Sequence, residues 1–396
     1  MWLRQVNLIG TSGYRDIRID GHRIAAVAPF DPDPGPESEP GIQLNGALVF
    51  PGLINSHDHL DFNLFPRLGN GIYRNYTAWG NDIHLRNKQT IEEVLKVPLA
   101  LRTAWGIYKN LLNGVTTVVN HGERLTVPSN TITVFQDARS LHSPAFERNW
   151  KWKLNMPFAG RISFVMHLGE GTDAAAKQEI DRVAKWNLIR RKIIAVHGVA
   201  MTERQARAFQ ALVWCPDSNF FLLNSTASVD RLRSAIDILF GTDSTLTSDW
   251  NLWEQLRLAR KQGLLSDRQL IDTLTTNAAR VWSSGRSGQI MEGEEADLVI
   301  AKPKPGLRGL DRFFDLNPAD LLLVIHRGNI RLFDETILDR VGENDVRIAD
   351  FSRVELSGSV KYIWGQLPQL MEEIGTYYPA ASFPVTACSD KISVVS

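Results

Sequence analysis

The stretch PGLINSHDHL at residues 51–60 marks the point at which the character of the sequence changes. Before it, short strand-like runs are separated by Gly, Asp and Pro residues. After it, short apolar runs such as GVTTVVNH (114–121) and KIIAVHG (192–198) alternate with segments of helical periodicity such as AAAKQEIDRVAKWN (174–187). Strands that alternate with helices predict a parallel sheet with right-handed crossovers. Six or more such units over about 240 residues predict an α/β fold, the (β/α)8 TIM barrel.

The composition of the chain excludes several classes of protein. The 396 residues contain 44 Lys and Arg against 44 Asp and Glu, so no general attraction to nucleic acid or to an anionic membrane is expected. Two cysteines, Cys215 and Cys388, are too few for a disulfide framework. The N-terminal residues MWLRQVNLIG lack the pattern of a signal peptide, and no apolar run approaches the ~20 residues that cross a bilayer. We therefore expect a soluble, cytoplasmic protein with no nucleic-acid or membrane partner.

His57 and His59 stand on either side of Asp58, directly after the apolar run ALVFPGLIN. In an extended strand, residues two apart point to the same side, so two imidazoles can share one metal ion. Such a pair is often structural on its own. Its weight therefore depends on whether further metal-binding side chains occur at later strand ends.

Four later residues lie at or just after the ends of apolar strands. His167 ends RISFVMH, Glu170 follows it by three residues, His197 ends KIIAVHG, and Asp243 ends IDILFGTD. Barrel enzymes place their chemistry at the C-terminal ends of strands. The alternatives are rim histidines satisfied by hydrogen bonds, and helix-start roles for Glu170 and Asp243. Nitrogen and carboxylate ligands of this kind suit Zn²⁺ or Fe²⁺.

Taken in order, these motifs resemble the amidohydrolase superfamily, and within it the cytosine/guanine deaminase and chlorohydrolase-like branch. The resemblance covers the chain from about residue 45 to about residue 302. The matching segments are PGLINSHDHLDFNLF, NGVTTVVNHGE, FVMHLGEGTD, VHGVAMTERQ, WCPDSNFFLLNSTA, LFGTDSTLTSDWNLWEQLRLA, TTNAARVW and GQIMEGEEADLVIAK.

The resemblance implies a site with one divalent metal ion, Zn²⁺ in preference to Fe²⁺. Glu170 resembles the proton shuttle, and His197 resembles the residue that orients water and polarises the substrate. Asp243 would also take a proton from the water, and Asn219 would support the site. The metal ligands implied are His57, His59, His167 and Asp243.

The resemblance also implies the domain organisation and the reaction. Residues 1–48 and 287–345 would build a small β-sandwich, residues 49–286 the barrel, and residues 346–396 a C-terminal extension. The reaction would be hydrolysis of a C–N bond in a small molecule, in its favoured form the deamination of an amino-substituted heterocycle. A homodimer is the family's common state.

The substrate contacts are the least determined part of the sequence. Arg67, Tyr76 and Trp79 lie in the long segment after the first barrel strand, where pocket residues are common, although a surface aromatic cluster is an equal alternative. His121 ends a strand at the same rim and His142 lies in a loop; structural and exposed roles are the defaults for these two.

The sequence departs from the branch in three places. The third and fourth strands must come from residues 131–160, where ITVFQDARSLHS is clear and WKLNMPFAG is blurred. Trp214 stands where many deaminases of the branch have His. Asp249 is a second acid near the eighth strand, and Asp243 is favoured over it because it directly ends that strand.

Two other functions remain open from the sequence. One is a two-metal amide or lactam hydrolase, in which His167 and His197 would bind a second ion beside a bridging group such as a carboxylated Lys153. The other, from a different class, is an inactive barrel that serves as a scaffold.

Overall fold

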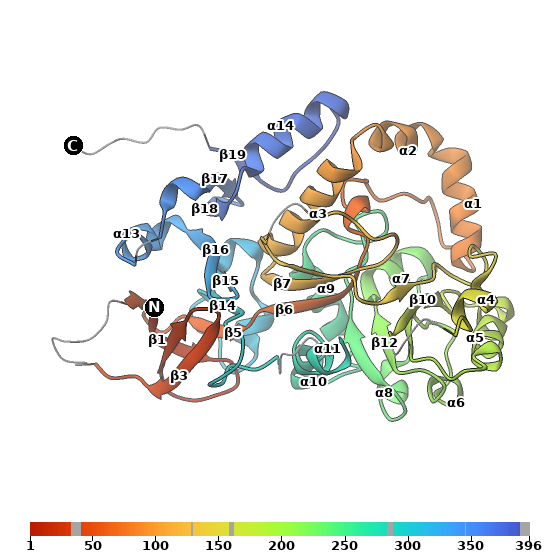
Figure 1. Ribbon diagram of the computed structural model, residues 1–396, viewed down its shortest axis with the longest axis horizontal. Helices are drawn as coiled ribbons and strands as arrows, with labels where there is room; N and C mark the ends of the chain where they lie inside the picture. Colours follow the sequence, from red (N-terminus) through yellow and green to blue (C-terminus); the bar gives the residue numbers. More distant parts are fainter. Residues whose placement is uncertain (33–40, 128–129, 158–161, 283–287, 345, 389–396) are drawn as a thin grey trace. The chain divides into compact units, whose positions relative to one another are not determined.

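The computed structural model describes residues 1–32, 41–127, 130–157, 162–282, 288–344 and 346–388 (Figure 1). The chain divides into two compact units, which are described separately. The β unit consists of Met1–Gly52, Asn110–Thr116 and Gln289–Ser396, and the α/β unit consists of Leu53–Lys109 and Thr117–Gly288. No helix among the described residues has the length and apolarity to span a membrane.

The β unit contains one sheet to which both ends of the chain contribute. The N-terminal β5 pairs antiparallel with the C-terminal β14, with Val49 opposite Ile300, and both side chains are fully buried. The packing of this sheet as a sandwich stays a prediction. The eleven strands of the sheet are β1 (Trp2–Leu8), β2 (Arg15–Asp20), β3 (Arg23–Pro29), β4 (Gly41–Gln43), β5 (Leu48–Pro51), β14 (Leu298–Ala301), β15 (Leu321–His326), β16 (Asn329–Asp334), β17 (Phe351–Leu356), β18 (Ser359–Trp364) and β19 (Thr386–Ala387).

The strands of the α/β unit follow one another in space in the order of the chain. They form a three-stranded sheet, β6-β7-β8, and a five-stranded sheet, β9 to β13, in which each described ladder is parallel. The predicted α/β class with parallel strands is confirmed. Closure into one hydrogen-bonded barrel is not seen among the described residues. The strands are β6 (Leu53–Asp58), β7 (Val115–Asn120), β8 (Thr133–Phe135), β9 (Arg139–Ser140), β10 (Phe164–Leu168), β11 (Ile193–His197), β12 (Ala211–Trp214) and β13 (Asp237–Phe240).

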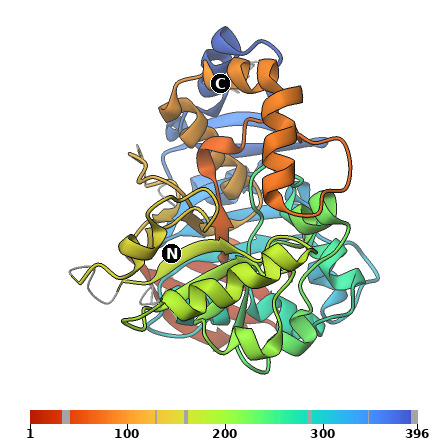
Figure 2. The same ribbon diagram turned by 90° about the vertical axis from the view of Figure 1, so that its right-hand side faces the viewer.

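Helices follow most of these strands, and α5 is seen along the strand layer in Figure 2. Its Ile180 and Val183 have no exposed surface. The helices of this unit are α1 (Tyr76–Arg86), α2 (Lys88–Leu95), α3 (Leu99–Leu112), α4 (Trp150–Leu154), α5 (Ala174–Trp186), α6 (Glu203–Ala206), α7 (Pro216–Leu223), α8 (Val229–Leu232), α9 (Leu252–Lys261), α10 (Asp267–Asp272) and α11 (Thr276–Trp282).

The prediction of a fourth strand in WKLNMPFAG (152–160) is wrong for its described residues, 152–157. Trp150 and Leu154 are buried four residues apart while Trp152 between them is 66% exposed, which is the period of a helix. The third and fourth strands, β8 and β9, both come from ITVFQDARS (132–140). Residues 158–160 lie outside the described residues.

Strand alternation places the site directly above the core of the α/β unit. Val165 of β10 belongs to an apolar cluster that includes Ile194, Val213 and Leu239 from the neighbouring strands. His167 follows Val165 by two residues and therefore points to the same face, one step nearer the C-terminal end. The apolar core thus forms the floor of the site.

Gly106 of α3 allows this helix to approach the residues that follow β6. A Cβ at this position would lie 2.2 Å from the carbonyl oxygen of Leu60. We expect Gly106→Ala to lower the free energy of unfolding by about 1–3 kcal/mol, because the helix must move away. Gly375→Ala is the matched control, since a Cβ there meets nothing within 4 Å, and it should be neutral or stabilising. Equal urea midpoints for the two variants would contradict this packing.

Candidate metal centre and active site

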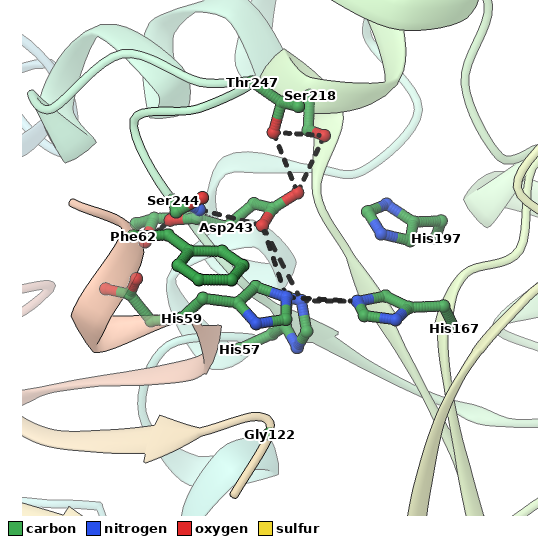
Figure 3. A network of polar contacts seen from close by, with 12 residues as sticks. His57, His59, Phe62, Gly122, His167, His197, Ser218, Asp243, Ser244 and Thr247 are labelled. Atoms are coloured by element: carbon green, nitrogen blue, oxygen red, sulfur yellow. Dashed lines mark hydrogen bonds and ion pairs between the residues drawn. The ribbon is translucent and has the colours of Figure 1, made fainter. Parts of the chain in front are cut away.

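Three imidazoles and one carboxylate meet at the C-terminal ends of β6, β10 and β13 (Figure 3). The Nε2 atom of His167 lies 3.2 Å from Nε2 of His57 and 3.3 Å from Nε2 of His59. Oδ1 of Asp243 lies 3.8 Å and 3.9 Å from the same two atoms of His57 and His59. The donor atoms of His57, His59 and Asp243 form one group that could hold a metal ion, and His167 adjoins two of its members, so the four residues are candidate ligands of one small ion. His57, His167 and His197 form a second such group.

The four donors fit a divalent metal ion by distance and by chemistry. Donors placed tetrahedrally at the usual zinc bond lengths are about 3.3 Å apart. Burial, reinforced by the neighbouring imidazoles, lowers the pKa of His57 and of His167 well below the usual value. Both side chains are therefore neutral, which is the form that binds metal. Three nitrogens and one carboxylate oxygen suit Zn²⁺ and Fe²⁺.

Hydrogen bonds outside the centre orient two of these ligands. Nδ1–H of His167 donates to the backbone carbonyl of His142 at 2.9 Å. A carbonyl can only accept, so Nε2 of His167 carries its lone pair toward the centre. Oδ2 of Asp243 accepts hydrogen bonds from the hydroxyl groups of Ser218 at 2.8 Å and Thr247 at 3.0 Å.

Asp243 stays ionised although it is buried. Burial alone would raise the pKa of its carboxyl group, but His59, His197 and the hydrogen bond from Ser218 lower it below the usual value. The backbone N–H of Ser244 also donates to Oδ1 at 2.8 Å. The side chain is therefore available as an anionic ligand and as a base.

The backbone is strained at two of the predicted site residues. His197 has φ +69° and Asp243 has φ +55°, in the left-handed region that side chains other than glycine seldom adopt. Each of the two lies where its strand turns into the following loop. Strain of this kind is commonly held at functional sites.

Glu170 and His197 face each other beside the metal ligands. Oε2 of Glu170 lies 3.6 Å from Nε2 of His197, and both side chains are buried. Burial, followed by the charges of Asp243 and Glu179, raises the pKa of Glu170 well above its usual value. Glu170 can therefore carry a proton at neutral pH.

A chain of polar side chains fixes the ring of His197. Nδ1–H of His197 donates to Oδ1 of Asn219 at 2.9 Å, which leaves Nε2 as an acceptor. The amide of Asn219 donates to the hydroxyl group of Thr226 at 3.2 Å, and the indole N–H of Trp214 donates to the same hydroxyl at 2.6 Å. Trp214, a departure from the branch, is thus linked to His197 through Thr226 and Asn219.

A cavity of about 420 Å³ opens onto these groups. His59, His167, Asp243, Glu170 and His197 line it, as do Tyr76 and Trp79, which the sequence predicted as substrate contacts. The cavity also has apolar walls that the sequence did not indicate. Their members are Phe62, Phe65, Ile83, Ile91, Leu95, Phe146 and Leu246.

Three predicted substrate residues do not line this cavity among the residues described. Arg67 forms an ion pair with Asp217. Asn219 contacts His197 instead. His121 is buried, and its ring centre lies 4.3 Å from that of His167.

Of the remaining candidates, His142 lines the cavity, whereas Lys153 and Asp249 have other partners. His142, for which an exposed loop position was the default, is exposed and lines the cavity. Lys153 lies on α4 and pairs with Glu147 at 2.8 Å, outside the ligand cluster. Asp249 accepts a hydrogen bond from the backbone of Asn251, so Asp243 is the acid at the centre.

Sequence reasoning missed one buried cation next to the centre. Nζ of Lys109, on α3, lies 3.0 Å from Oδ2 of Asp58 and 2.9 Å from Oδ1 of Asn63. Both members of the ion pair are buried, with 1% and 0% of their side chains exposed. A lysine on the apolar face of the helix LALRTAWGIYKNLL was the available signal.

Comparison with known proteins supports this fold. The model of the amidohydrolase family matches residues 158–331. A 5-methylthioadenosine/S-adenosylhomocysteine deaminase of Pyrococcus furiosus is 24% identical over 361 residues, covering 72% of this chain and 81% of that protein.

Two solved structures share the fold at low sequence identity. An adenosine deaminase of Xanthomonas campestris with bound zinc has a TM-score of 0.62 at 17% identity, covering 83% of this chain and 92% of that one. The atrazine chlorohydrolase TrzN of Arthrobacter aurescens, complexed with zinc, has a TM-score of 0.62 at 16% identity, covering 87% and 98%. The chain is thus similar to the amidohydrolase family over residues 158–331, and it shares the fold of these solved structures.

Proposed function

We propose that the protein is a metal-dependent hydrolase that deaminates an amino-substituted heterocycle. One observation carries the proposal: a buried glutamate with a raised pKa, Glu170, lies at the cavity wall beside a cluster of three histidines and Asp243. A proton donor next to metal ligands is what the departure of an amine requires. The deaminases among the relatives support the same reaction.

The metal site we propose holds one divalent ion, zinc in preference to iron. His57, His59, His167 and Asp243 would bind it. When bound, the ion would supply Lewis-acid activation of the attacking water. The adenosine deaminase and the atrazine chlorohydrolase structures both contain zinc, which supports this choice.

The protein's own residues would manage the protons. The carboxylate of Asp243 would accept one proton of the attacking water, and the lone pair on Nε2 of His197 would orient that water. Glu170 would deliver its proton to the ring nitrogen. The water oxygen forms a bond to the ring carbon and the C–N bond breaks. One proton of the water would pass through Asp243 to the departing ammonia, and the other would return to Glu170, which has protonated the ring nitrogen.

Lys153 does not supply the bridging group that the two-metal alternative needs. A carboxylated lysine would have to lie between His167 and His197, and Lys153 instead pairs with Glu147 on the surface of α4. His57, His167 and His197 do lie close enough to share an ion, so the number of ions must be measured.

We predict one zinc or iron ion per chain, measured by inductively coupled plasma mass spectrometry of the purified protein. Asp243→Asn should lose most of this metal and the ammonia-releasing activity, because it removes the only anionic donor of the proposed ligand set. Asp249→Asn is the matched control and should retain both. Two ions per chain would favour the binuclear hydrolase. A metal-loaded protein that releases no ammonia from a broad panel of aminated pyrimidines, purines and triazines would overturn the deaminase proposal.

A further inference from the structure

The cavity beside the metal ligands is bounded by two pairs of aromatic rings. The ring of Phe62 stacks on His59, with centroids 5.5 Å apart, and packs against Phe65. The ring of Phe146 lies 5.4 Å from His142 and 5.4 Å from Tyr76. Aromatic faces of this kind bind flat, uncharged rings.

The same cavity offers no lysine or arginine to an anionic substrate among the described residues that line it, and its acids are Glu170 and Asp243. Arg67, the candidate from the sequence, is engaged by Asp217. A carboxylate or phosphate on the substrate, away from the metal ligands, would lose its hydration without gaining an ion pair with lysine or arginine.

The cavity has room for more than an aminated ring. Water occupies about 30 Å³ per heavy atom, so about 420 Å³ corresponds to at least about 14 heavy atoms. Ile83, Ile91 and Leu95 add an aliphatic wall from α1 and α2. Leu95 and Phe146 line the cavity and are each 49% exposed, so apolar area is available for a ligand to cover.

We propose that the substrate is an uncharged aminated heterocycle that carries an apolar substituent. The flat ring lies at the metal ligands and Glu170, and the substituent covers the apolar surface that includes Leu95 and Phe146. This inference rests on the proposed deaminase function and adds the class of substrate to it.

Two series of compounds test the inference, and within each series the aminated ring is constant and only the substituent changes. The probes are adenines substituted at N9 and 2,4-diamino-1,3,5-triazines substituted at C6, each with hydrogen, methyl, butyl, hexyl or 5-carboxypentyl. For whichever of the two rings the enzyme deaminates, we expect kcat/KM for ammonia release to rise from the hydrogen to the hexyl compound, by up to about fourfold per buried methylene. The carboxypentyl compound should fall at least tenfold below the hexyl compound.

A charge introduced at the rim provides the second arm. Leu95→Arg should lower kcat/KM for the hexyl compound and raise it for the carboxypentyl compound, so that their ratio shifts at least tenfold. Leu85→Arg is the matched control, because Leu85 lies on α1, is 80% exposed and is not among the residues that line the cavity. The ratio should not change in this variant.

The outcomes separate the two proposals. Ammonia release that is fastest for the unsubstituted or carboxylated compounds would overturn the substrate class and leave the deaminase function standing. Absence of ammonia from every compound, with tighter binding of the hexyl compounds to the zinc-loaded protein by calorimetry, would overturn the reaction and support the apolar subsite. If no compound releases ammonia and the hexyl compounds do not bind more tightly, both the reaction and the substrate class are overturned.

Discussion

Glu170→Gln is expected to lower kcat by about 10²–10⁴-fold while the metal ion remains bound. An amide has the shape of the protonated carboxyl group but cannot release a proton to the ring nitrogen. Glu170 is suited to this release because burial and the neighbouring acids Asp243 and Glu179 raise its pKa. Steady-state ammonia release and metal content, measured on the same sample, check the expectation.

The matched control for this variant is Glu179→Gln on α5. Glu179 is also buried, but it accepts hydrogen bonds from the hydroxyl group of Tyr76 and the backbone N–H of Gly169, and it does not line the cavity among the described residues. It should retain much more activity than Glu170→Gln. A Glu170→Gln variant that keeps a tenth or more of wild-type kcat would exclude Glu170 as the proton donor. Loss of metal from that variant would indicate a structural role instead.

The pH profile provides an independent test of the proton donor. Glu170 must be protonated to act, so activity is lost as the pH rises through its pKa. Glu179 is one of the charges that raise this pKa. Neutralising it in Glu179→Gln should lower the pKa of Glu170 and move the alkaline limb of kcat/KM to lower pH. An unchanged alkaline limb would mean that another group controls it.

The clustering of these candidate ligands could be predicted from the sequence because strand geometry is local, while their role as metal ligands stays a prediction. His57 and His59 are two residues apart, and the strand that contains His167 has an unambiguous apolar pattern. Parallel strands bring their C-terminal ends to one edge, so the cluster follows from the order of the strands. The choice of Asp243 over Asp249 followed from the same rule, and Asp243 lies at the centre.

The sequence did not predict the features that depend on packing between distant segments. The apolar walls of the cavity come from α1, α2 and the segment around Phe146, whose relation to the strand ends is not contained in any spacing. Arg67 looked available for a ligand because its partner, Asp217, lies 150 residues away. The third and fourth strands were hard to separate because β8 and β9 are only three and two residues long.

A buried ion pair, Lys109 with Asp58, is the other feature that the sequence did not predict, and it lies next to the ligands. Asp58 stands between His57 and His59 in the chain. Nζ of Lys109 also lies 3.3 Å from the hydroxyl group of Thr242 and 3.4 Å from the backbone carbonyl of Asp243. One ammonium group thus joins α3 to the ends of β6 and β13, which carry three of the four proposed ligands. We infer that Lys109 is a positioning residue for the metal centre.

Lys109→Met is therefore expected to destabilise the protein by about 3–5 kcal/mol, because the buried carboxylate of Asp58 would lose the ammonium group that neutralises its charge. The variant should also bind zinc at least tenfold more weakly, as measured by competition with a chromophoric chelator on the metal-free protein. The double variant Asp58→Asn with Lys109→Met should recover much of the stability, since it removes the buried negative charge together with the ammonium group. It should recover less of the zinc affinity, since the link to Thr242 and to the Asp243 carbonyl stays broken.

Lys361→Met separates positioning from a general loss of stability. Lys361 is 0% exposed and pairs with Asp334 at 2.6 Å, so it forms an equivalent buried ion pair within the β unit. Its loss should also lower the free energy of unfolding by about 3–5 kcal/mol. It should leave the zinc affinity of the folded protein unchanged. Equal losses of zinc affinity in the two variants would show that Lys109 acts through stability alone. Unchanged zinc affinity in Lys109→Met would show that the ligands hold their geometry without it.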